Sequence, residues 1–103
     1  MITSKTTYAD LITADVRLLI LQTLEQDAGY SHNEGILQSA LRSLGHTLSR
    51  DQVRTQLQWL AEQELVQLFQ TSGLHVATIT ARGLDVASGA ASVPGVARPR
   101  PAL

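Results

Sequence analysis

Two arginines and a glutamine recur at helical spacing in the segment 49–63. Arg50, Arg54 and Gln58 lie four residues apart, so a helix would place their side chains on one face. Arginine can form two hydrogen bonds with guanine, glutamine can do the same with adenine, and arginine also pairs with phosphate. The spacing therefore indicates a helix that presents donors to duplex DNA. A solvated helix face without a partner explains it equally well, because charged surface faces are common.

Other polar residues around this segment could complete a DNA contact. Thr47 and Ser49 lie near the expected start of the helix, where hydroxyl and backbone N–H groups bind phosphate. The turn 71–75 contains no lysine or arginine, so its contacts with DNA would be weak. About two to four phosphate contacts per subunit imply salt-sensitive binding of modest affinity. The candidate DNA-binding residues are Thr47, Ser49, Arg50, Arg54, Thr55, Gln58 and Arg82.

A homodimer would present two such helices to DNA and so raise the affinity. In the segment 13–28, Leu18 and Leu21 lie off the main apolar face of the expected helix, which is therefore apolar on two sides. The second side packs either on the rest of the chain or on a second subunit. Leu18 and Leu21 are the candidate residues of a dimer interface.

The sequence contains no catalytic or metal-binding pattern. It has no cysteine, which excludes disulfides, thiolate zinc sites and thiol catalysis. His32, His46 and His75 lie in three separate segments, and none has the spacing of a paired metal ligand. There is no phosphate-binding glycine loop and no serine-nucleophile motif. We therefore expect a protein that is not an enzyme and that needs no cofactor or metal.

Length and composition favour one small globular domain. The chain has 103 residues, 44% of them apolar, and a formal net charge of −1. This balance argues against a strongly basic nucleic-acid-binding surface but allows a local one. The stretch from Val16 to Leu21 is too short to span a membrane, and residues 1–10 hold no apolar run typical of a signal peptide. We expect a cytoplasmic protein without a membrane partner.

Two capping patterns predict where the central helices begin. Ser49 and Gln52 have the spacing of a capping box, which predicts a helix that starts at residue 50 and runs to about residue 63. Ser31 and Glu34 have the same spacing and predict a preceding helix that ends at Gly45. A tight connection therefore joins the two helices, as in a helix-turn-helix.

Three further elements complete the expected fold. A short lead-in at 8–12 precedes a helix over 13–28 that Thr13 caps. Strand-like runs at 66–71 and 74–79 predict a hairpin, and a helix over 81–88 follows it.

These elements divide the chain into three parts. Residues 1–12 are expected to form an N-terminal arm and lead-in, and residues 13–88 the folded domain. Residues 89–103 hold all three prolines and otherwise mostly alanine, glycine, valine and arginine. Such a composition predicts a flexible tail that buries no core.

In this order of elements the chain resembles the winged helix-turn-helix family, in the style of small bacterial regulators of the ArsR and MarR types. One stretch that carries the resemblance runs from Gln52 to Val66, where a helix ends in an apolar pair that starts a strand. The other runs from Ile79 to Ala87 and has the pattern I-T-x-x-G-x-x-x-A. More narrowly, the chain is similar to small winged-helix proteins of Mu-like prophages. It departs from the family at Glu64, where glycine is often found.

The resemblance implies a mainly α fold with a small β-hairpin wing. It also implies a phage or bacterial transcriptional regulator whose 49–63 helix enters the major groove of double-stranded DNA. The alternative is a phage-encoded protein-interaction adaptor without DNA binding, in which the same fold is only a scaffold. A net charge near zero, an uncharged hairpin turn and the spare leucines of the first helix favour the adaptor.

Overall fold

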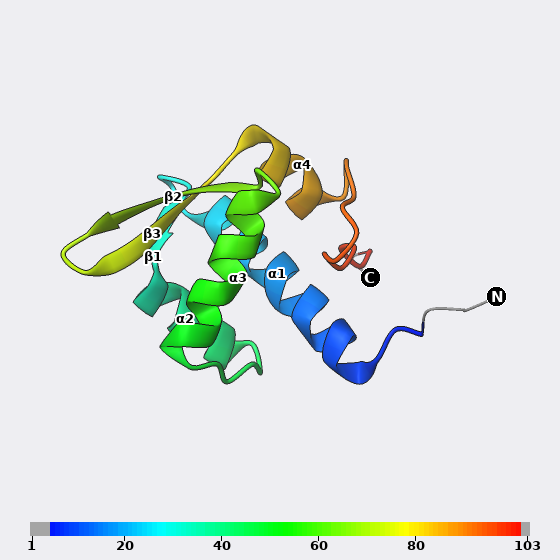
Figure 1. Ribbon diagram of the computed structural model, residues 1–103. Helices are drawn as coiled ribbons and strands as arrows, with labels where there is room; N and C mark the ends of the chain where they lie inside the picture. Colours follow the sequence, from blue (N-terminus) through cyan, green and yellow to red (C-terminus); the bar gives the residue numbers. More distant parts are fainter. Residues whose placement is uncertain (1–4, 102–103) are drawn as a thin grey trace.

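The computed structural model describes residues 5–101 of the chain, which form both helices and strands (Figure 1). Within these residues four helices accompany one three-stranded antiparallel sheet, so the fold is α+β as expected. None of these helices is long and apolar enough to cross a membrane. The elements are α1 (Tyr8–Gln26), β1 (Ser31–Asn33), α2 (Glu34–Ser43), α3 (Arg50–Glu62), β2 (Val66–Thr71), β3 (Leu74–Ile79) and α4 (Ala81–Ser88).

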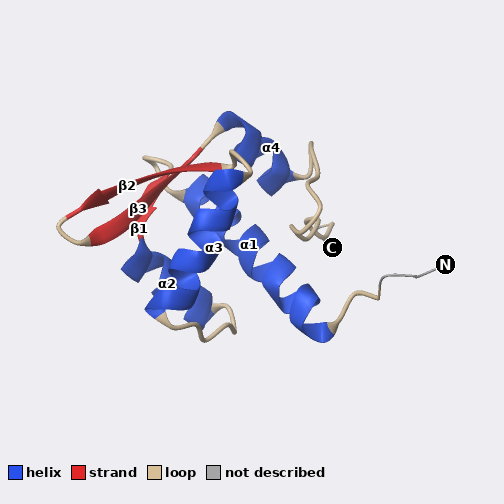
Figure 2. Ribbon diagram, in the orientation of Figure 1, coloured by secondary structure: helices blue, strands red, loops and turns tan. Residues whose placement is uncertain are grey.

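The sheet is built around β3, which lies between β1 and β2 (Figure 2). The predicted hairpin is confirmed: β2 and β3 pair from Val66 opposite Ile79 to Thr71 opposite Leu74. Ser72 and Gly73 turn the chain with φ angles of 51° and 78°. Sequence analysis did not predict β1, because three residues are too short to show an alternating pattern.

The core forms where one stripe of each helix meets the sheet. α1 packs against α2, α4 and β3, and α3 packs against α2 and β2. The inward face of α3 consists of Val53, Leu57 and Leu60, which are all fully buried. Burial of such a side chain contributes about 1.5–3 kcal/mol, so this stripe fixes α3 on the body of the protein.

The first helix begins earlier than predicted. Thr7 caps α1: its hydroxyl accepts a hydrogen bond from the Asp10 N–H at 3.0 Å, and the Asp10 carboxylate accepts one from the Thr7 N–H at 3.1 Å. The expected start at Thr13 is therefore wrong, and residues 8–12 are not a separate lead-in. A complete capping box satisfies two backbone donors, whereas a threonine alone satisfies one. The part of the expected arm that comprises residues 1–4 lies outside the described residues.

The start of α2 also differs from its prediction. Asn33 is the N-cap, and its side chain accepts a hydrogen bond from the Ile36 N–H at 3.0 Å. Ser31 instead lies in β1 opposite Thr78, and the two hydroxyls form a hydrogen bond of 3.0 Å. The expected box of Ser31 and Glu34 is therefore wrong. Strand pairing holds Ser31 away from the helix end, and Glu34 becomes the first helical residue with its side chain buried.

The connection from the hairpin to α4 explains the I-T-x-x-G-x-x-x-A pattern of residues 79–87. The Thr80 hydroxyl accepts a hydrogen bond from the Gly83 N–H at 3.0 Å and donates one to the Glu64 carbonyl at 2.8 Å. A Cβ at Gly83 would collide with the Leu65 carbonyl oxygen, so only glycine allows α4 to pack this closely. Glu64 itself has a φ of 63°, the left-handed conformation that accounts for glycine in the resembled family.

The segment after α4 packs on the body of the protein, which corrects the prediction of a flexible tail that buries no core. Val93 and Val96 are only 7% and 8% exposed. The Ala97 N–H donates to the Ala14 carbonyl at 3.1 Å, so the segment is joined to α1. Composition suggested a tail because prolines and small residues dominate, but Val93 and Val96 supply apolar contacts with the core.

Arg17 and Trp59 hold this segment in place. The Arg17 guanidinium lies 3.7 Å from the centre of the Trp59 ring and donates a hydrogen bond to the Gly95 carbonyl at 3.1 Å. Gly95 has a φ of 96°, and a Cβ there would come within 2.9 Å of the Trp59 ring. The docked segment therefore requires glycine both for backbone conformation and for space.

We expect Gly95→Ala to destabilise the fold by about 2–3 kcal/mol, from left-handed strain and from the clash with Trp59. Gly45→Ala is the matched control, since Gly45 has a φ of 99° but nothing within 4 Å of its Cβ position. The control should lose only about 1 kcal/mol. Urea unfolding followed by Trp59 fluorescence measures both losses. Equal losses in the two variants would show that the segment is not docked on Trp59.

Candidate functional site

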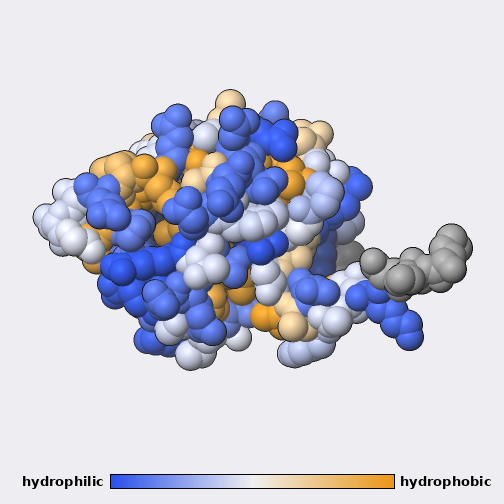
Figure 3. Space-filling view, viewed as in Figure 1, coloured by the Kyte–Doolittle hydropathy of each residue, from blue (hydrophilic) through white to orange (hydrophobic). Residues whose placement is uncertain are grey.

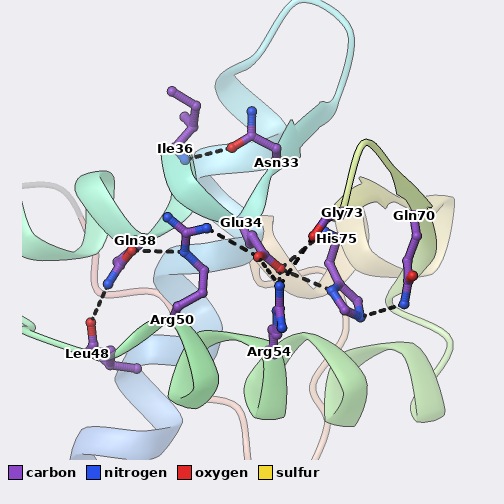
Figure 4. A network of polar contacts seen from close by, with 10 residues as sticks. All are labelled: Asn33, Glu34, Ile36, Gln38, Leu48, Arg50, Arg54, Gln70, Gly73 and His75. Carbon is purple, nitrogen blue, oxygen red and sulfur yellow. Dashed lines mark hydrogen bonds and ion pairs between the residues drawn. The ribbon is translucent and has the colours of Figure 1, made fainter.

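A buried carboxylate lies beneath the predicted DNA-contacting face. Glu34 starts α2, and its side chain is fully buried, the one charged residue of the described chain in that position. Figure 4 shows it at the centre of a polar network that reaches to α3 and to the β2–β3 hairpin. A buried carboxylate costs several kcal/mol unless cations and hydrogen-bond donors surround it, so its neighbours are constrained by its charge.

The two arginines of α3 supply that compensation. Arg54 binds Glu34 with two hydrogen bonds, from Nε to Oε2 at 2.8 Å and from Nη2 to Oε1 at 2.7 Å. Arg50 adds a third contact, from Nη1 to Oε1 at 3.3 Å. The sequence placed both arginines on an outward face but did not predict that they bind a buried carboxylate. Their side chains nevertheless remain 39% and 45% exposed, so each guanidinium has one side on Glu34 and one side on water.

The hairpin completes the shell of donors. The His75 backbone N–H lies 3.1 Å from Glu34 Oε2, and His75 Nδ1 lies at the same distance from that oxygen. Nη2 of Arg54 also reaches the Gly73 carbonyl in the hairpin turn at 3.4 Å. The imidazole contacts Gln70 through Nε2 at 3.2 Å. One carboxylate thereby joins α2, α3 and the hairpin.

A second branch of the network fixes the turn between α2 and α3. Arg50 Nε donates to the Gln38 side-chain oxygen at 3.1 Å, and the Gln38 amide donates to the Leu48 carbonyl at 2.9 Å. The start of α3 is also capped as predicted: the Ser49 hydroxyl accepts from the Gln52 N–H at 3.1 Å, and the Gln52 side chain accepts from the Ser49 N–H at 2.9 Å. The capping box stabilises the start of α3, and the contacts through Gln38 tie this first turn to α2 and to the connecting turn.

These contacts shift the pKa values of Glu34 and Arg54 in opposite directions, and both shifts favour the charged form. The Arg54 hydrogen bonds lower the pKa of Glu34 from 4.5 to about 2, against burial, which raises it. The same bonds raise the pKa of Arg54 above its ordinary value. Two guanidinium groups and one carboxylate leave the cluster with one net positive charge. The outer side of the cluster is therefore cationic but weakly so.

The remaining predicted DNA-binding residues lie at different places around α3. Thr47 and Ser49 are exposed in the turn before it, and Thr55 and Gln58 are exposed along it. The Thr55 hydroxyl donates to the Asp51 carbonyl at 3.1 Å, within the helix. Arg82 is at the opposite end, where its Nε donates to the Gln63 carbonyl at 3.1 Å. Asp51 and Glu62 share the exposed surface of α3, which is polar without an excess of cations.

The predicted dimer residues are not available for a partner. Leu18 is 5% exposed and Leu21 is fully buried within the single chain. α1 packs on α2, α4 and β3, so both of its apolar sides are used internally along this part of the helix. Of the two alternatives that the sequence left open, packing within the chain is the one observed for these leucines.

Sequence analysis missed the role of Glu34 because a local capping role explained it. The pair of arginines four residues apart on α3 could have indicated this role, because their two positive charges repel each other unless an acidic residue lies nearby. It also missed that each histidine has a carboxylate partner. His32 lies 2.8 Å from Asp27, and His46 lies 2.7 Å from Asp15, in addition to the contact of His75 with Glu34.

We expect Glu34→Gln to lower stability at neutral pH by about 3 kcal/mol, the free energy that corresponds to the fall in the Glu34 pKa. Because the folded-state pKa is the lower one, this stabilisation is present above pH 4.5 and is lost as the pH falls toward 2. Wild type and variant should therefore approach each other in stability at acid pH. Urea unfolding over this pH range measures the difference.

Glu62→Gln serves as the control for this experiment. Glu62 ends α3 and is exposed, so the same chemical change there should alter stability little at any pH. A gap between wild type and Glu34→Gln that stays constant from neutral to acid pH would contradict the proposed ionisation of Glu34.

Comparison with known proteins places the chain among phage-related proteins. No protein-family model matches the sequence. It is 52% identical over 92 residues to the uncharacterized protein gp26 of Escherichia phage Mu, a match that covers 89% of this chain and 95% of gp26. It is 46% identical over 78 residues to an uncharacterized protein of Haemophilus influenzae, covering 75% of this chain and 76% of that protein. The chain therefore belongs to the family of phage Mu gp26.

Proposed function

We propose that this protein is a winged-helix DNA-binding protein of modest affinity, with α3 in the major groove and the β2–β3 hairpin as its wing. The order of the elements supports the winged helix: α2 and α3 are joined by a short turn, and a hairpin and α4 follow. The pairing of β1 with β3 supports it too, since it ties the hairpin to the segment before α2. Transcriptional regulation is the role that the resemblance implies, and the phage Mu relative supports a phage setting.

The Arg50–Arg54–Glu34 cluster carries the proposal. Glu34 holds the two guanidinium groups at the junction of α3 and the hairpin turn, and both remain partly exposed. Cations that are already positioned lose little side-chain entropy when they meet phosphate, because their rotamers are fixed beforehand. The network therefore favours binding of a rigid anionic surface over a flexible one.

The hydrogen bonds to Glu34 also suggest which residues of α3 contact phosphates and which contact bases. The edge of Arg54 that carries Nε and Nη2 is occupied by Glu34, so this edge cannot read guanine. Arg50 and Arg54 then act as phosphate contacts that position the helix, as most protein contacts to DNA do. Base reading falls to Thr55 and Gln58, whose side chains are exposed.

A protein-interaction adaptor is the second candidate. The observation that favours it is the charge balance of α3, where Asp51 and Glu62 share the exposed surface with the arginines and Glu34 neutralises one of them. An adaptor would use the same face of α3 for a polar protein surface. Salt-dependent binding of DNA and binding of a protein partner by the same face distinguish the two candidates.

Gln58 offers a cleaner test than the arginines, since removal of Arg54 would leave Glu34 buried without its main partner. We expect Gln58→Glu to weaken binding of short duplex DNA by about tenfold and Gln58→Lys to strengthen it, with a salt dependence that changes by about one charge. Fluorescence anisotropy with a labelled duplex, measured over a series of salt concentrations, gives both quantities.

Gln26→Glu is the matched control, because Gln26 is an exposed glutamine at the end of α1. It makes the same change in net charge away from α3 and should leave DNA binding unchanged. If the wild-type protein shows no salt-dependent DNA binding at low ionic strength, the proposal of DNA binding is wrong. A protein partner whose binding is lost in Gln58→Glu but kept in Gln26→Glu would favour the adaptor.

A further inference from the structure

The first turns of α1 expose large apolar side chains. Tyr8 is 78% exposed and Leu11 is 59% exposed, the largest values among the large apolar residues of the described chain. In Figure 1 this end of α1 projects from the body toward the N-terminus, away from the sheet. The capping box of Thr7 and Asp10 stabilises the start of these turns. An exposed apolar helix end of this kind is typical of an interaction surface.

Two grooves flank this end of the helix, and Ile12 lines both. A groove of about 410 Å³ separates α1 from the turn between α2 and α3, where Leu48 is one of its walls. A second groove of about 580 Å³ separates α1 from the docked C-terminal segment. Figure 3 shows small apolar patches between α3 and α1, besides a larger apolar area over the β2–β3 hairpin. The projecting end of α1 is therefore a ridge between two hollows.

The second groove combines an apolar wall with a basic one. The wall from α1 is a stripe at helical spacing, which is the pattern of a helix–helix contact. The opposite wall carries Arg98 and Arg100, and within residues 5–101 neither forms an ion pair. The members of the α1 stripe are Leu11, Ile12, Asp15, Leu18, Leu19 and Gln22.

We propose that this groove is the interface of a homodimer in which the α1 helices of two copies pack antiparallel. A ridge and a groove on the same surface are self-complementary, which a two-fold interface requires. An antiparallel pair centred near Asp15 would set Leu11 of one copy against Leu19 of the partner subunit. Leu11, Ile12 and Leu19 would make this interface, whereas Leu18 reaches the groove with only 5% of its surface and Leu21 is fully buried within the single chain.

Charge complementarity favours a second copy over an unrelated partner. Asp10 is exposed on the ridge, and Asp15 lines the groove, where it pairs with His46 at 2.7 Å and stays 45% exposed; the opposite wall carries Arg98 and Arg100. Two copies related by a two-fold axis bring the acidic ridge of each against the basic wall of the other. Without those arginines, the aspartates that meet near the axis would repel each other. The proposed interface does not rest on DNA binding, and it is tested without DNA.

The oligomeric state of the full chain tests the surface. We expect the wild-type protein to sediment as a dimer, and Leu11→Glu to raise the dissociation constant of the dimer by about tenfold or more, because it places a charge in an apolar contact. Phe69→Glu is the matched control, since Phe69 is 52% exposed on β2, far from α1 in the fold. It should stay dimeric. Circular dichroism establishes that both variants are folded.

Single cysteines test the antiparallel register, because the chain has none of its own. We expect a mixture of Leu11→Cys and Leu19→Cys proteins to form a disulfide-linked dimer at least tenfold faster than either protein alone. A wild-type protein that remains monomeric at every concentration tested overturns the proposal. A dimer that Leu11→Glu leaves intact, or cross-linking of Leu11→Cys with itself at the rate of the mixture, also overturns it.

Discussion

The arrangement of the helices and the hairpin depends on one buried charge, the carboxylate of Glu34. Two guanidinium groups from α3 and a backbone N–H from the hairpin surround it, so three elements that are distant in sequence share one anchor. Apolar packing alone would tolerate small shifts of α3 against the hairpin, since it is not directional. Hydrogen bonds to a buried carboxylate do not tolerate them, because every lost donor leaves charge uncompensated. Glu34 therefore sets the orientation of α3 and of the hairpin turn together.

The same interaction limits what the exposed face of α3 can do. Arg50 and Arg54 give part of their hydrogen-bonding capacity to the interior and retain part for a ligand. If the proposed DNA binding holds, they would act as fixed cations rather than as readers of individual bases. A surface with one net positive charge held rigidly is suited to contacts whose strength comes from position, and DNA phosphates meet that description.

The C-terminal segment shows a similar double role. It covers part of the core through Val93 and Val96, and it supplies the basic wall of the groove beside α1. Arg17 links the two functions, because it holds the Gly95 carbonyl from α1 while it lies over Trp59 of α3. The proposed DNA surface and the proposed dimer surface thus use different faces of one small domain, with the proline-containing segment serving the second.

Local signals in the sequence determined much of this fold. The capping box of Ser49, the inward stripe of α3, the turn at Ser72 and Gly73 and the cap of α4 at Thr80 all act within a few residues, so they could be predicted without knowledge of the rest of the chain. Other features depended on contacts between distant segments: the pairing of β1, the docking of residues 93–97 and the burial of Leu18 and Leu21. The sequence alone determined that Arg50 and Arg54 share a helix face. Only the tertiary structure decided that this face turns toward Glu34. A buried carboxylate needs cations beside it, and the packing of α3 against α2 brings Arg50 and Arg54 to that position.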